Sequence, residues 1–145
     1  MTARFLLDAS AFWRLIQHPE LADRWAAAID AWELGLSPAT RTEILYSARG
    51  PEDRDRMAED LDAIAEHVPV PKDVFGWIDT AQYKLTLAGA HRSAGVVDLI
   101  LCATAATRGL TVLHDDKDFY TVARILPDVS ALRITDALPG RSTPA

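Results

Sequence analysis

Residues 110–118 of the 145-residue chain read LTVLHDDKD, a short apolar run that ends in three acidic side chains. A short continuous apolar run is typical of a strand buried on both faces, as in a parallel sheet. Residues 4–8, RFLLD, repeat the arrangement, with Asp8 closing the run. We therefore expect two buried parallel strands, each with acids at its carboxyl end.

Between these strands, stretches of helical periodicity alternate with short extended segments. Helices are expected over residues 9–17, 19–33, around 43–45 and ending before 50, from 51 onward, 74–88, 96–108 and 118–126. Further strands are expected over residues 35–38, 68–71 and 130–134. Alternation of short strands and helices predicts an α/β fold in which helices cover both faces of a central parallel sheet.

The composition is that of one ordinary globular domain. The chain is 49% hydrophobic and 25% charged, and its formal net charge is −6, so the charge does not itself indicate nucleic-acid binding. Its one cysteine, Cys102, excludes an internal disulfide, and no apolar stretch is long enough to cross a bilayer. We expect a single domain over residues 1–138, a loose tail over residues 139–145 and a cytoplasmic location.

Two further acids stand in apolar surroundings. Asp98 is the only charged residue in GVVDLILCA, residues 95–103, and Glu43 directly precedes Ile44. A buried carboxylate is costly unless it is paired or binds a cation. Because the carboxyl ends of parallel strands share one edge of the sheet, we expect acids to converge there around a divalent metal ion. Carboxylate oxygens suit Mg²⁺ or Mn²⁺ better than zinc, and such sites commonly serve phosphoryl chemistry.

Each acid also has an ordinary structural interpretation. Asp8 and Asp98 could cap helices, and Glu43 could be a solvated surface acid. Asp116 and Asp118 could serve a turn or a cap. Only the joint pattern favours a metal site.

Histidine and tryptophan side chains invite functional interpretations of their own. His114 could act as a general base, but packing at a strand end is the preferred interpretation. Trp25 and Trp32, seven residues apart on one expected helix, could line a groove for a partner, and core packing is again preferred.

Four pieces of the sequence, taken in order, resemble the motifs of PIN-domain nucleases, and most closely those of VapC-type toxins of prokaryotic toxin–antitoxin pairs. They are LLDASA at residues 6–11, RTEIL at 41–45, VDLILCATA at 97–105 and HDDKDF at 114–119. The resemblance implies an α/β/α sandwich with a central parallel sheet. It also implies an endoribonuclease that cleaves RNA phosphodiesters through a water activated by Mg²⁺ or Mn²⁺.

The resemblance implies roles for individual side chains. The catalytic acids carried over are Asp8, Glu43, Asp98 and Asp116, with Asp8, Asp98 and Asp116 as metal ligands. Ser10 is implied as the hydroxyl that holds Asp8 or a metal-bound water, and Asp118 as an extra ligand or an acid behind the ligands. The register with Asp118-Phe119 favours Asp116 over Asp115. The implied partners are RNA, a cognate antitoxin protein and a second copy of the chain in a homodimer.

Two other functions are alternatives. A phosphatase with an aspartate nucleophile would use Asp8, but that class usually has a second acid two residues later, where this chain has Ser10. A non-catalytic PIN-like interaction module would have no need of the full acidic set. At His114 the chain departs from the family, which often has a small hydroxyl residue there.

Overall fold

Five short strands form one sheet in the order β3-β2-β1-β4-β5, and every neighbouring pair is parallel. The computed structural model in which they are seen describes residues 2–136. The strands are β1 (Phe5–Leu7), β2 (Leu34–Leu36), β3 (Glu66–His67), β4 (Thr111–His114) and β5 (Ser130–Arg133). The two strands that were predicted to end in acidic residues, β1 and β4, lie side by side in the middle of the sheet. This confirms the predicted parallel sheet.

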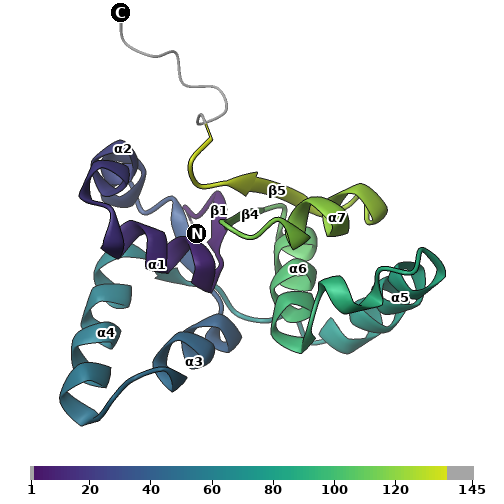
Figure 1. The fold of residues 1–145 in the computed structure, drawn as a ribbon, viewed down its shortest axis with the longest axis horizontal. Coiled ribbons are helices and arrows are strands. Elements are labelled where there is room, and N and C mark those ends of the chain that lie inside the picture. The colour runs from purple at the N-terminus through teal and green to yellow at the C-terminus, as the bar shows by residue number, and fades with distance from the viewer. Residues whose placement is uncertain (1, 137–145) are drawn as a thin grey trace, which may run out of the picture.

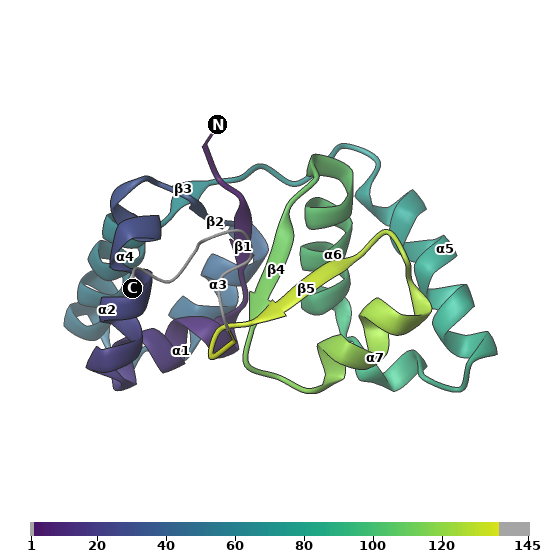
Figure 2. The ribbon, with the colours of Figure 1, turned by 90° about the horizontal axis from the view of Figure 1, so that it is seen from above.

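Helices cover both faces of the sheet, as the alternation of elements predicts (Figures 1 and 2). They are α1 (Ala9–Gln17), α2 (Pro19–Asp30), α3 (Pro38–Tyr46), α4 (Pro51–Ile64), α5 (Val74–Leu87), α6 (Val96–Arg108) and α7 (Asp118–Ile125), with a short 3₁₀ turn at His91–Ser93. In Figure 2, α1 to α4 lie to one side of the central strands and α5 to α7 to the other. The three layers are those of an α/β/α sandwich.

The core is divided by the sheet into two halves. Phe5, Leu7 and Leu113 pack with the helices α1 to α4, whereas Leu6 and Val112 pack with α5 to α7. Successive residues of a strand point to opposite faces, so a strand buried on both sides must be apolar throughout. This explains why the two central strands are continuous apolar runs.

Trp25 and Trp32, the two tryptophans considered above as a partner groove, have different environments. Trp25 is fully buried, its ring meets Phe5 edge-on at 5.3 Å between centroids, and its Nε1 donates to the Ile134 carbonyl at 3.0 Å. The core interpretation is therefore right for Trp25. Trp32 lies beyond the end of α2 with a φ of 56° and is 44% exposed. Left-handed backbone at Trp32 ends the helix, so α2 stops at Asp30 rather than at residue 33.

The third strand differs from its predicted position. It was expected over residues 68–71, but β3 consists of Glu66 and His67. The Val68 N–H still donates to the Leu36 carbonyl at 3.0 Å, and Pro69 then has no N–H with which to continue the ladder. The predicted tail over residues 139–145 lies outside the described residues. None of the helices in residues 2–136 is both long and apolar enough to cross a membrane.

Candidate active site

Asp8 lies directly after β1 and is both a helix cap and a buried acid. Its backbone N–H donates to the Leu113 carbonyl at 2.9 Å, which fixes it beside the end of β4. Its Oδ2 accepts hydrogen bonds from the Ser10 backbone N–H at 3.1 Å and from the Ser10 hydroxyl at 2.5 Å. The residue is only 6% exposed. The Asp8 carboxylate therefore caps α1 and also makes the predicted contact with Ser10.

Asp98 occupies the first turn of α6, where it also caps its own helix. Its Oδ2 accepts a hydrogen bond from the Gly95 N–H at 3.3 Å. Burial is the main reason that its pKa rises from 3.8 to about 6, and negative charge on Asp8, Glu43 and Asp116 adds to the shift. A half-buried carboxyl whose pKa is raised by the charges of three other acids is not an ordinary helix cap.

The same electrostatic coupling links the remaining acids. Burial raises the pKa of Asp8 against the opposing hydrogen bonds of Ser10, and the charge of Asp116 raises it further. Burial and the charge of Asp8 raise the pKa of Glu43 on α3. Glu43 and Asp116 are exposed whereas Asp8 and Asp98 are not. The structure thus brings together four acids from four separate segments, in a group that solvent can reach.

The three acids of the loop after β4 have different surroundings. Asp115 is an ion-pair partner of two arginines, with Arg14 Nε at 2.5 Å and Arg133 Nε at 2.8 Å from its carboxylate oxygens. Asp116 is the loop acid whose charge reaches Asp8 and Asp98. Asp118 begins α7 and contacts Asp116 through its backbone N–H, which donates to Asp116 Oδ1 at 3.0 Å. The loop therefore directs Asp116 toward the other acids and Asp115 toward the arginines.

The donor set of this group suits a hard divalent cation. Within residues 2–136, no three His, Cys, Asp or Glu side chains are already gathered closely enough to hold a metal ion. In the same part of the chain, none of the four acids forms an ion pair with a basic side chain. Mg²⁺ keeps several waters and commonly uses only one or two carboxylates, so a loose oxygen-only group fits it. A cation would also relieve the repulsion that, after burial, raises the pKa of Asp8, Glu43 and Asp98.

His114 is packed, as preferred from the sequence. It is fully buried, with its ring against Phe119 and Tyr120 at centroid distances of 5.0 Å and 5.2 Å. Burial lowers its pKa against the opposing charges of the nearby acids. Its Nδ1 accepts a hydrogen bond from the Asp116 N–H at 3.2 Å.

Sequence reasoning missed two polar side chains at the start of α3, the helix that carries Glu43. Ser37 follows β2 and Thr40 lies in the first turn of α3, the helix of Glu43; both are buried, and neither hydroxyl has a hydrogen-bond partner in the described residues. The only signal was the pattern of Ser37 before Pro38, which is typical of a helix start. Ser37 makes no such side-chain cap.

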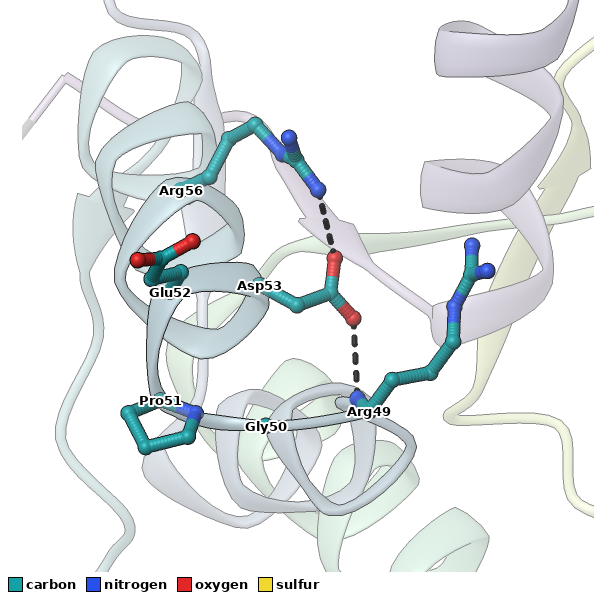
Figure 3. Close-up of a pocket in the computed structure, with 6 residues that line it drawn as sticks. All are labelled: Arg49, Gly50, Pro51, Glu52, Asp53 and Arg56. Atoms are coloured by element: carbon teal, nitrogen blue, oxygen red, sulfur yellow. Dashed lines mark hydrogen bonds and ion pairs between the residues drawn. The ribbon is translucent and has the colours of Figure 1, made fainter.

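A hollow at the start of α4 contains none of the predicted site residues (Figure 3). Asp53 lies at its centre and accepts hydrogen bonds from the Arg49 backbone N–H at 2.9 Å and from Arg56 Nη2 at 2.8 Å. These bonds lower the pKa of Asp53. The polar contacts in the hollow are thus explained by the way in which Asp53 stabilises the start of α4.

Fold and site together define an α/β/α protein with an acidic group at the carboxyl edge of its parallel sheet. The PIN domain family matches residues 5–125. Ribonuclease VapC6 of Mycobacterium tuberculosis is 44% identical over 104 residues, which are 72% of this chain and 82% of that protein. Ribonuclease VapC18 of the same organism is 39% identical over 123 residues, 83% of this chain and 88% of that protein. The chain therefore belongs to the PIN-domain family, among the VapC ribonucleases.

Solved structures share the fold at low sequence identity. VapBC2 from Rickettsia felis, bound to a promoter DNA fragment, aligns with a TM-score of 0.74 at 14% identity and covers 89% of this chain and 97% of that chain. DNA-bound VapBC from Salmonella typhimurium aligns with a TM-score of 0.74 at 19% identity and covers 91% and 98%. The likeness extends over nearly the whole described chain and confirms the α/β/α architecture.

Proposed function

We propose that this protein is an endoribonuclease that acts as the toxin of a toxin–antitoxin pair and needs Mg²⁺ or Mn²⁺. The observation that carries the proposal is the convergence of Asp8, Glu43, Asp98 and Asp116 at one sheet edge, where burial and then the charges of neighbouring acids raise the pKa of Asp8, Glu43 and Asp98. The names of its relatives support RNA cleavage. An acidic protein that processes an anionic substrate needs a source of positive charge, and a divalent cation supplies it.

Asp8, Asp98 and Asp116 are the residues proposed to hold the ion. When bound, it would neutralise charge on the scissile phosphate and lower the pKa of a water. Ser10 holds Asp8 Oδ2 through its hydroxyl and its backbone N–H. Glu43 has a raised pKa, so its carboxylate is suited to accept a proton from the attacking water. The resemblance to PIN-domain nucleases implies that hydrolysis leaves a 5′-phosphate and a 3′-hydroxyl.

A cognate antitoxin is part of the proposal. Structural neighbours include VapBC of Mycobacterium tuberculosis, a member of a family of toxin–antitoxin systems, and VapBC structures bound to DNA, which supports an equivalent protein partner for this chain. Removing that partner should release the activity. The homodimer stays a prediction. Trp25 cannot contribute to its surface, because the side chain is fully buried.

The test is cleavage of a mixed pool of tRNA, rRNA and mRNA by antitoxin-free protein. We expect cleavage with Mg²⁺ or Mn²⁺, none with chelator, and none by Asp8→Asn. Asparagine caps helices as well as aspartate, so the variant should fold. The matched control is Asp53→Asn, which removes an equally hydrogen-bonded acid from the hollow at α4 and should leave cleavage intact. Undiminished cleavage by Asp8→Asn, or in chelator, would refute the proposal.

A further inference from the structure

Three backbone N–H groups in the loop that carries Asp116 donate hydrogen bonds to side-chain acceptors. The Asp115 N–H donates to Ser10 Oγ at 2.9 Å, and the Asp116 N–H donates to His114 Nδ1 at 3.2 Å. The Asp118 N–H donates to Asp116 Oδ1 at 3.0 Å. Each bond fixes one peptide of the loop. Of the three, the bond to His114 is the one made by the amide of Asp116 itself.

Packing alone does not account for a histidine at position 114. The ring is fully buried, and its Nε2 has no hydrogen-bond partner within residues 2–136. A buried polar atom without a partner destabilises a fold by about 1–3 kcal/mol, and an apolar side chain of similar size avoids this cost. What an apolar side chain cannot provide is the acceptor at Nδ1. Because Nδ1 accepts a hydrogen bond, the ring is neutral with its proton on Nε2.

The ring is itself firmly placed. Phe119 and Tyr120, in the first turn of α7, lie against it. The His114 carbonyl accepts a hydrogen bond from the Ile134 N–H at 2.8 Å, beside the end of β5. An acceptor that is held by a strand and by a helix can define the position of the loop between them.

We propose that His114 is a positioning residue of the acidic site. Its Nδ1 holds the backbone of Asp116 and thereby keeps the Asp116 carboxylate within the electrostatic reach of Asp8 and Asp98. The inference rests on the proposed function, since Asp116 is one of the acids proposed to bind the ion. Partners behind metal ligands typically change metal affinity about 10- to 100-fold when they are removed.

Two variants of nearly the same shape separate the acceptor from the packing. Asparagine carries its amide oxygen on Cγ, the atom to which Nδ1 is bonded in histidine, so His114→Asn keeps an acceptor close to the original position. His114→Leu has the same branched shape and no acceptor. Val112→Ala, in the buried part of the same strand, is the control for a general loss of stability.

The experiment measures two quantities on antitoxin-free full-length protein. Hydrogen exchange of the Asp116 amide, followed by NMR without metal, reports on the hydrogen bond. The affinity for Mn²⁺, followed by the EPR signal of the free ion, reports on the site. We expect His114→Leu to exchange at least about 10-fold faster and to bind Mn²⁺ about 10- to 100-fold more weakly. His114→Asn should stay within about threefold of the wild type on both, and Val112→Ala should lose only melting temperature.

Equal values for His114→Leu and His114→Asn in both measurements would overturn the inference, because packing would then be the whole role. Should the leucine variant fail to fold, His114→Ser against His114→Ala poses the same question. A serine hydroxyl can accept from the N–H two residues on, and alanine cannot. A wild type that binds no Mn²⁺ would refute the metal dependence of the proposed function. The Asp116 exchange rates would still decide whether His114 holds the loop.

Discussion

Replacing Asp98 by asparagine should stabilise the metal-free protein at neutral pH and remove its stabilisation by metal. Asp98 Oδ2 accepts a hydrogen bond from the Gly95 N–H at 3.3 Å, and an asparagine oxygen can accept the same bond. The substitution therefore keeps the cap and the shape. What it removes is a negative charge that lies among those of Asp8, Glu43 and Asp116.

The size of the effect follows from the pKa of Asp98, which rises from 3.8 to about 6. The folded state holds the proton more tightly, so the carboxyl favours folding at low pH, and this contribution is lost as pH rises from about 4 to about 6. The full shift corresponds to about 3 kcal/mol. Because Asp98 is only partly buried, we expect asparagine to recover about 1–2 kcal/mol, or roughly 3–8 °C in melting temperature.

Urea and thermal unfolding of both proteins should be compared at pH 4 and pH 7.5, first in chelator and then in Mn²⁺. In chelator the variant should be the more stable at pH 7.5, and the difference should shrink at pH 4. Mn²⁺ at a hundredfold excess over its Kd should stabilise the wild type by about 2.7 kcal/mol and the variant by much less. A variant equally destabilised at both pH values, or equal stabilisation of both proteins by Mn²⁺, would refute the electrostatic argument.

Three further substitutions test the packing that supports the site. In Gly35→Ala the new Cβ would lie 2.5 Å from Val68 Cγ2, so the urea midpoint should fall by the equivalent of about 1–3 kcal/mol, and an unchanged midpoint would contradict the close contact. Trp25→Phe removes the donor to the buried Ile134 carbonyl and should cost at least about 1–3 kcal/mol in urea unfolding; a loss below about 0.5 kcal/mol would mean that this bond contributes little. Asp115→Asn breaks the ion pairs with two arginines and should cost about 1 kcal/mol at low salt, whereas a loss that is the same in 1 M NaCl would exclude an electrostatic origin.

The central part of the fold could be predicted from the sequence because its signals are local. Continuous apolar runs mark β1 and β4, and proline and glycine mark many helix ends. The third strand carried no such signal, because it consists of Glu66 and His67 and is defined by its pairing with β2. The end of α2 depends on the left-handed backbone of Trp32, a conformation that the identity of a tryptophan does not indicate.

The residues of the candidate site likewise divide into those that carry a local sequence signal and those that do not. Asp98 was predictable because a lone charge in an apolar helix contradicts its surroundings. Among the acids after β4, only the register with Asp118-Phe119 favoured Asp116, since the partners that hold Asp115 are distant in the sequence. The Asp116 N–H donates to His114, two residues before it, whereas Asp115 is held by arginines on α1 and β5. The two arginines can be recognised as partners only once the chain is folded.

The acidic group is not what stability alone would place at this edge of the sheet. A cap at Asp98 needs an oxygen acceptor and no charge, and asparagine would supply it without repulsion from Asp8 and Glu43. Yet the chain places charged carboxyls on neighbouring elements, where burial and mutual repulsion raise the pKa of Asp8, Glu43 and Asp98, so that their ionisation weakens the fold. A cation bound among them would reverse this penalty, because it would stabilise the folded state by binding to it alone. Repulsion in the free protein and the proposed affinity for a cation would therefore be two consequences of one arrangement, and the Asp98→Asn variant should lose both together.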